Sequence, residues 1–110
     1  MRRAMIKIGT QMAGILTQDD EGYHFEYDEA YVNQIDVKPV SLTLPVQKAI
    51  YTSRVLFPFF DGLIPEGWLL DIAEKNWKLN PRDRMGLLLA CCKDCIGAVS
   101  VEEINENEKR

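Results

Sequence analysis

The chain has 110 residues, of which 46% are hydrophobic and 27% are charged, and 13 Lys and Arg against 17 Asp and Glu give a net charge of −4. A chain of this length builds one domain around one core. The acidic balance disfavours nucleic acids and membrane surfaces as partners, because both attract positive charge. No apolar run reaches the ~20 residues of a membrane span, and the N-terminus lacks the apolar region of a signal peptide. We therefore expect a cytoplasmic protein without membrane contact.

The first third of the chain predicts an antiparallel meander. Its three candidate strands are the apolar, β-rich segments 4–9 and 12–17 and the alternating segment 23–28. Residues 19–22, Asp-Asp-Glu-Gly, give a turn signal before the third strand. In that strand Tyr23, Phe25 and Tyr27 fall on one face and polar side chains on the other. This alternation is typical of a half-buried strand.

After the meander the pattern changes from strands to helices. Residues 29–35 predict a short helix or turn, and residues 40–46 predict a further strand. Pro65 suits the first position of a helix, and Glu66 suits the positive end of the helix dipole. We therefore expect a helix over residues 65–78.

The last third predicts one more helix and a returning strand. Asn80 as N-cap and Pro81 at the first position, with an aspartate at the third, indicate a helix that runs to about Cys91. The side chains that this helix should bury are Met85, Leu88 and Leu89. Residues 95–101 predict the last strand, and we expect the charged segment 102–110 to be a frayed tail.

Strands first, helices later and one returning strand indicate an α+β domain. We expect a curled antiparallel sheet, made of the early hairpin or meander plus the C-terminal strand. Two to three helices should pack on one side of this sheet. Residues 1–101 would form this single domain, followed by the tail.

Acidic residues cluster in the first third of the chain. No Lys or Arg occurs between Ile8 and Val37. The carboxylates of this segment are Asp19, Asp20, Glu21, Glu26, Asp28, Glu29 and Asp36. Two interpretations stay open: an ordinary solvated face, or an acidic patch that steers a basic partner.

Residues that would carry catalysis or bind a metal are scarce. The phosphate-binding patterns GxGxxG and GxxxxGK[ST] do not occur. His24 is the only histidine and stands on the polar side of a predicted strand, so a nucleophile–histidine pair is not expected. Cys92 and Cys95 would supply only half of a zinc site, and we expect reduced thiols. The sequence thus predicts no enzyme and no catalytic, cofactor-binding or metal-binding residue.

The stretch Phe57–Trp68, FPFFDGLIPEGW, combines aromatic residues with prolines and glycines. On the expected helix Trp68 and Trp77 are nine residues apart and so lie on opposite sides. Trp77 falls with the apolar residues, whereas Trp68 falls with charged residues and faces water. Exposed tryptophans are enriched in binding hot spots, which makes Trp68 a candidate interface anchor. The alternative, that Trp68 covers Phe59 or Phe60 of its own loop, stays open.

Five short motifs come in a characteristic order. They are Gly14-Ile15-Leu16, Phe25-Glu26-Tyr27-Asp28, Ser41-Leu42-Thr43-Leu44-Pro45, FFDGLIPEG at residues 59–67 and DCIGAV at residues 94–99. In this order they resemble the N-terminal subdomain of the HipA family of toxin kinases, over nearly the whole chain. Two positions depart from the family pattern, because Ile64 replaces a leucine and Cys92 stands where a glycine is common.

This resemblance implies a function. HipA proteins continue into a Ser/Thr kinase core, whereas this chain stops at Arg110 without an ATP loop or a catalytic aspartate. The chain is therefore similar to HipS, the free-standing counterpart family in HipBST toxin–antitoxin modules. That family implies an antitoxin that binds and neutralises a HipT-like Ser/Thr kinase. The complex would also contain a HipB-like helix-turn-helix protein, without direct nucleic-acid contact by this chain.

The resemblance and the position of Trp68 together predict a kinase-contact site. Its residues are Phe59, Phe60, Asp61, Leu63, Pro65, Glu66, Gly67 and Trp68. We expect Trp68, supported by the phenylalanines and Pro65, to block the kinase cleft or to hold the kinase loops open.

Two other functions stay open. In the first of these functions, the chain would complete a HipA-like kinase in trans without inhibiting it. In the second it would be a DNA-binding co-repressor, because basic residues surround the connection between the two expected helices. They are Lys75, Lys78, Arg82 and Arg84, with Lys93 nearby. An ordinary solvated face is the alternative explanation of that cluster.

Overall fold

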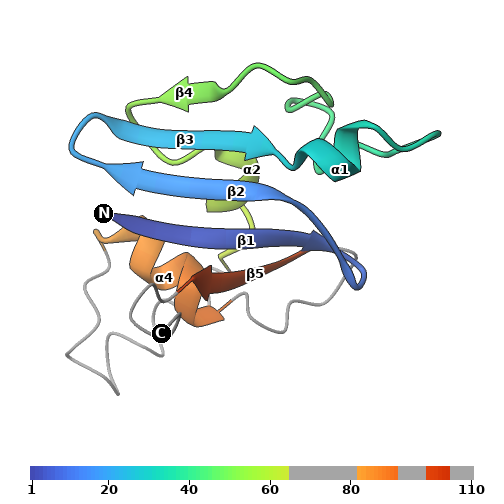
Figure 1. The fold of residues 1–110 in the computed structure, drawn as a ribbon. Coiled ribbons are helices and arrows are strands. Elements are labelled where there is room, and N and C mark those ends of the chain that lie inside the picture. The colour runs from blue at the N-terminus through green and yellow to red at the C-terminus, as the bar shows by residue number, and fades with distance from the viewer. Residues whose placement is uncertain (65–81, 92–98, 105–110) are drawn as a thin grey trace, which may run out of the picture.

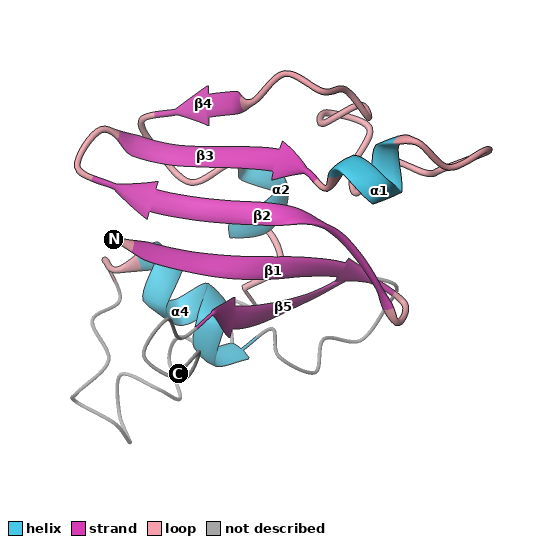
Figure 2. Ribbon diagram, viewed as in Figure 1, coloured by secondary structure: helices cyan, strands magenta, loops and turns pink. Residues whose placement is uncertain are grey.

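The computed structural model describes residues 1–64, 82–91 and 99–104, which form an antiparallel sheet with helices behind it. The strand order in the sheet is β4-β3-β2-β1-β5. The strands are β1 (Arg2–Ile8), β2 (Gln11–Asp19), β3 (Gly22–Tyr27), β4 (Tyr51–Ser53) and β5 (Val99–Ile104), and the helices are α1 (Glu29–Val32), α2 (Pro58–Asp61) and α4 (Arg84–Cys91). Figure 1 shows α2 and α4 on the same side of the sheet, and Figure 2 shows the same two layers by element type. The predicted α+β class is confirmed.

The meander of β1, β2 and β3 follows the predicted pattern. β1 turns into β2 at Gly9, whose φ of 63° is the left-handed conformation that glycine adopts readily. β2 pairs with β3 across the predicted acidic turn. Tyr23, Phe25 and Tyr27 are buried, whereas Glu26 is exposed on the other face. The period-two pattern therefore identified both faces of β3.

The core lies between the sheet and the two helices α2 and α4. Its largest fully buried side chains are Ile6, Leu16, Phe25, Phe60, Met85, Leu87, Leu88 and Val101. They come from four strands and from both helices, so their removal from water joins the two layers. In α4 the predicted burial of Met85 and Leu88 is confirmed, while Leu89 is only partly buried and Leu87 is fully so.

The connection between α1 and β4 differs from the prediction. No strand forms over residues 40–46. Instead, Ser41 and Leu44 make an isolated bridge around a tight turn, in which the Leu44 N–H donates to the Ser41 carbonyl at 3.0 Å. Leu42, at the tip of this turn, is 93% exposed. The strand that extends the sheet beside β3 is β4, farther along the chain.

Tyr27 explains why the chain turns at this point. Its hydroxyl donates to the carbonyl oxygen of Leu44 and accepts the N–H of Val40 at 3.0 Å. Burial raises the pKa of Tyr27, so the hydroxyl keeps the proton that it donates. One buried hydroxyl thus satisfies backbone groups on both sides of the turn. Two further tyrosines bond to carbonyl oxygens of the same connection: Tyr31 to Lys38 at 2.5 Å and Tyr51 to Pro45 at 2.6 Å.

The start of α4 lies three residues beyond the predicted one. The first helical residue is Arg84, and the preceding Asp83 takes the N-cap role that the sequence assigned to Asn80. The Asp83 carboxylate accepts the N–H of Gly86 at 3.1 Å, which is the standard N-cap bond. Asn80 and Pro81 lie outside the described residues.

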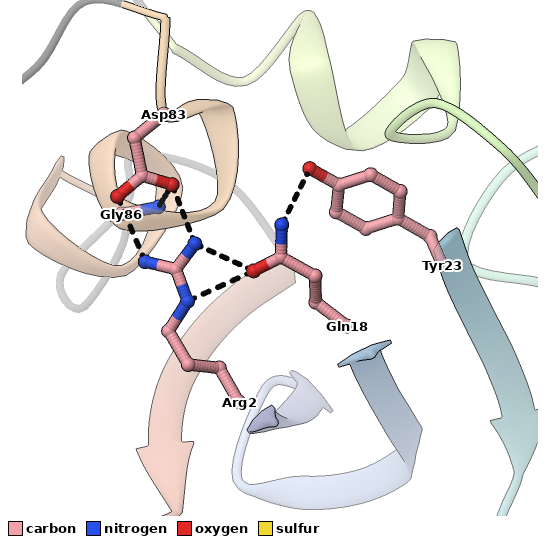
Figure 3. A network of polar contacts seen from close by, with 5 residues as sticks. All are labelled: Arg2, Gln18, Tyr23, Asp83 and Gly86. Atoms are coloured by element: carbon pink, nitrogen blue, oxygen red, sulfur yellow. Dashed lines mark hydrogen bonds and ion pairs between the residues drawn. The ribbon is translucent and has the colours of Figure 1, made fainter. Parts of the chain in front are cut away.

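The same carboxylate ties α4 to the sheet. Arg2 donates to both oxygens of Asp83, at 2.9 and 2.5 Å, and to the side-chain oxygen of Gln18 at 2.9 Å (Figure 3). The Gln18 amide in turn donates to the Tyr23 hydroxyl at 3.1 Å. The hydrogen bonds from Arg2 hold the pKa of Asp83 below its usual value, and those to Asp83 raise the pKa of Arg2. A forked arginine–carboxylate pair fixes geometry as well as energy, so it sets where α4 begins.

β5 returns along the edge of β1. It pairs antiparallel with β1 from Val99 to Ile104, so the first three residues of the expected tail belong to the sheet. Residues 95–98 of the predicted strand lie outside the described residues. In the part of the chain that the structure describes, no helix is long and apolar enough to cross a membrane.

Tyr27→Phe removes the hydroxyl that two backbone groups of the turn require. We expect the free energy of unfolding to fall by about 2–4 kcal/mol, because each unsatisfied buried group costs about 1–3 kcal/mol. Urea unfolding followed by circular dichroism measures the loss. The control is Tyr51→Phe, whose hydroxyl bonds at the surface and should cost about 1 kcal/mol or less. Equal losses in the two variants would contradict the role of Tyr27.

Asp83→Asn keeps a capping side chain but removes the charge that pairs with Arg2. At pH 7 we expect the free energy of unfolding to fall by about 0.5–1 kcal/mol, a modest loss because the pair is partly exposed. Folding lowers the pKa of Asp83, so its stabilisation is complete above the unfolded pKa of about 3.9 and is lost as the pH falls through the folded value. Urea titrations should therefore show the difference closing below about pH 4. A difference that persists in strong acid contradicts this account.

Candidate functional site

The segment from Phe57 to Ile64 contains the described members of the predicted kinase-contact site, which are Phe59, Phe60, Asp61 and Leu63. Phe57 is extended, with φ −55° and ψ 134°, and Pro58 follows at the start of α2, where a missing N–H costs nothing. The Asp61 N–H donates to the Phe57 carbonyl at 3.0 Å, and the Gly62 N–H donates to the Pro58 carbonyl at 2.9 Å. These bonds close a single helical turn that follows directly after an extended residue.

The segment 57–64, which contains α2, divides its side chains between the core and the surface. Phe57, Phe60 and Ile64 are buried, and Phe60 has no exposed area. The Phe60 ring centroid lies 5.5 Å from that of Phe25 on β3 and 5.2 Å from that of Phe59. Phe60 therefore supports the site from beneath and offers no face to a partner, although the sequence placed it among the contact residues.

Three half-buried side chains of this segment reach the surface, and we name them together the α2 surface: Phe59, Asp61 and Leu63. Phe59 stands edge-on against Phe60, with 68° between the ring planes. Leu63 packs at the margin of the core. Side chains that are partly held by packing lose little freedom on binding, which favours their use as interface anchors.

Asp61 ties the α2 surface to α4. Its carboxylate accepts the Nε–H of Arg84 at 2.6 Å, and both side chains are partly exposed. Arg84 directly follows Asp83, so the first residue of α4 reaches α2 and its N-cap reaches the sheet through Arg2. Nothing in the local sequence signals the pair, because 23 residues separate its partners.

Half of the predicted contact site lies outside the described residues. These positions are Pro65, Glu66, Gly67 and Trp68. Trp77, which the helical pattern placed on the apolar side, lies outside them as well. Whether Trp68 faces water or covers Phe59 or Phe60 therefore stays a prediction.

The basic cluster that suggested DNA binding is only partly described. Arg84 forms the ion pair with Asp61, and Arg82 is exposed. The remaining members, Lys75, Lys78 and Lys93, lie outside the described residues. Because Arg84 pairs with Asp61, its positive charge and its Nε–H donor are less available to bind a phosphate group.

His24 lies on the sheet face opposite α2 and α4, as the alternation predicts. Its Nδ1 lies 3.2 Å from the Thr52 hydroxyl, and its Nε2 lies 3.0 Å from the Asp19 carboxylate. Among residues 1–64, 82–91 and 99–104, no group of three or more His, Cys, Asp or Glu is arranged to hold a metal ion. Cys92 and Cys95 lie outside these ranges.

Comparison with known proteins supports the same architecture. The family model of the HipA N-terminal domain matches residues 4–102. A solved structure described as the N-terminal domain of HipA toxin superposes with a TM-score of 0.77 at 26% sequence identity. That superposition covers 96% of this chain and 95% of the solved one.

Two relatives by sequence differ in how much of them the chain spans. A protein of Haemophilus influenzae, described as uncharacterised, is 30% identical over 103 residues, which are 94% of this chain and 93% of that protein. The candidate kinase Y4mE of Sinorhizobium fredii is 29% identical over 92 residues, which are 83% of this chain and 22% of that protein. Because the family model extends over nearly all of its sequence, the chain belongs to the HipA N-terminal domain family.

Proposed function

We propose that this chain binds and neutralises a HipT-like Ser/Thr kinase by protein–protein contact. In this proposal it is the antitoxin of a tripartite complex that also contains a HipB-like helix-turn-helix protein. The observation that carries the proposal is the match, along almost the whole chain, to the N-terminal domain of HipA toxin. The proposal involves no enzymatic activity, cofactor or metal of the chain itself.

The two relatives explain why a kinase is the proposed partner. The matched region is 22% of the candidate kinase Y4mE, whereas it is 93% of the Haemophilus influenzae protein. The same kind of domain therefore occurs within a larger candidate kinase and also as nearly all of a small protein. In the proposal, the domain that is part of a larger candidate kinase in one protein binds a separate partner kinase when it occurs alone.

The α2 surface gives this contact a physical basis. Phe60 and the Asp61–Arg84 ion pair hold α2 in place, so Phe59 meets a partner at little entropic cost. In the proposal Trp68, a few residues farther along the chain, enters the kinase cleft. Phosphoryl transfer requires kinase loops and metal-bound phosphates to be aligned. An aromatic side chain that keeps those loops apart would stop it.

Trp68→Ala and Phe59→Ala should weaken neutralisation of the kinase. We expect each folded variant to lose about 2 kcal/mol of binding free energy, or roughly thirtyfold in Kd, because buried aromatic anchors dominate interfaces. Isothermal titration with a HipT-like kinase measures the affinity. Growth and kinase phosphorylation in cells that express both proteins measure the rescue.

The matched control is Leu42→Ala, which also removes an exposed apolar side chain but lies on the connection before β4. We expect its affinity and rescue to equal those of the unchanged chain. Full rescue by folded Trp68→Ala and Phe59→Ala variants would place the contact elsewhere. Slower growth with higher kinase phosphorylation on coexpression would instead support the accessory function, and DNA binding by the chain alone would support the co-repressor.

Reversing the Asp61–Arg84 pair tests its positioning role. Asp61→Arg and Arg84→Asp should each lower the free energy of unfolding by about 1 kcal/mol or less and weaken kinase binding. The double variant restores opposite charges at the same positions, so both stability and affinity should return. Stability that returns without affinity would show that Asp61 contacts the kinase directly. Affinity equal in all four proteins would contradict the positioning role.

A further inference from the structure

The sheet face opposite α2 and α4 carries a groove that the proposed kinase contact does not use. In Figure 1 this face is turned toward the viewer, and neither α2 nor α4 crosses it. Two adjoining hollows of about 320 and 210 Å³ open on it, and both are lined by Ile15 of β2 and Glu26 of β3. Because they share these residues, we treat them as one feature and name it the open-face groove.

Apolar side chains form part of the groove wall. Ile15 and Val32 line the hollow next to α1, and Ile15 with Ile50 lines the other. Ile50 is 54% exposed, and Ile15 and Val32 are half-buried. An aliphatic side chain placed against them would remove apolar area from water on both sides of the contact.

Three carboxylates border the hollow next to α1: Glu26, Asp28 and Glu29. Within the part of the chain that the structure describes, none of them forms an ion pair or a side-chain hydrogen bond. Asp28 precedes α1 in the N-cap position, yet its side chain makes no capping bond. Lys48 is the one basic residue that lines this hollow, so three negative charges face one positive charge at the α1 end, whereas Arg3 and His24 line the other hollow beside Glu26.

The structure also separates six of the seven acidic residues of this stretch into two groups, while Asp36 lies on the connection between α1 and β4. Asp19, Asp20 and Glu21 lie at the hairpin between β2 and β3, whereas the groove carboxylates lie at the opposite end of β3. The acidic stretch of the sequence is therefore not one patch. The hairpin group provides a natural control, because it has similar charge without the apolar wall of the groove.

We propose that the open-face groove binds an extended segment of a partner protein in which Arg or Lys stands beside an aliphatic residue. The aliphatic side chain packs on Ile15 and Val32, and the basic side chain meets the carboxylates at the α1 end. A nucleic acid would be repelled by these charges, and a free small amine would leave the apolar wall uncovered. Since the groove and the α2 surface lie on opposite faces, one chain can hold two partners at once. The inference does not depend on kinase binding.

The test uses the whole chain labelled with ¹⁵N and the blocked peptide acetyl-Gly-Arg-Leu-Arg-Gly-amide at low salt. We expect saturable amide shifts at Ile15, at residues 26–32 and at Lys48. The peptide with Glu in place of both Arg residues should produce none of them. Raising the salt concentration should weaken the association, because part of the attraction is between exposed charges.

Two matched double variants decide whether the groove or the overall charge is responsible. Glu26→Lys with Asp28→Lys should weaken the association at least tenfold, whereas Asp20→Lys with Glu21→Lys, the same change in net charge at the hairpin, should change it less than about twofold. If the first variant fails to fold, Glu26→Gln with Glu29→Gln replaces it and should weaken association about threefold to tenfold. Equal losses in groove and hairpin variants, shifts outside the groove, or no saturable shift would each overturn the proposal.

Discussion

The contact between Phe60 and Phe25 is the interaction on which the rest of the site depends. Phe25 lies on β3 with its ring close to Gly14 of β2, where a Cβ atom would meet the Glu26 carbonyl oxygen at 2.5 Å and that ring at 3.0 Å. Because Gly14 lets the ring settle on the sheet, Phe60 of α2 can pack against it at 5.5 Å. α2 is thereby held on one face of the sheet. Phe59, the next ring, is left half exposed at the surface.

Polar contacts then fix the positions of α2 and α4 relative to the sheet, which apolar packing alone specifies less precisely. Asp83 binds Arg2 of the sheet, and the adjacent Arg84 binds Asp61 of α2. Each partly exposed pair contributes about 1 kcal/mol or less, but forked and charged bonds tolerate little displacement. Gly86 belongs to the same arrangement, because a Cβ atom there would collide with the Asp83 carboxylate. The N-cap and the first residue of α4 therefore position both layers.

The sequence pattern predicted the features that depend on neighbouring residues. Alternation identified β3 and its buried face, and the fold class followed from element order. The expected strand over residues 40–46 was wrong, because Tyr27 draws that segment into a turn through a contact between distant residues. The start of α4 was misplaced for the same reason: Arg2, 81 residues away, favours Asp83 as the cap. Phe60, which the sequence placed in the contact site, is buried and supports the other residues of that site. The local sequence pattern predicted neither the Asp61–Arg84 pair nor the groove beside α1.

The central claim is that a kinase is held through the α2 surface and the residues that follow it, while the opposite sheet face stays available. Hydrogen–deuterium exchange of the chain, alone and mixed with a HipT-like kinase, tests this claim most directly. The account predicts slower exchange on kinase binding across residues 57–68 and unchanged exchange across residues 26–32, which border the open-face groove. Absence of a complex, or protection at residues 26–32 without protection at residues 57–68, would contradict it.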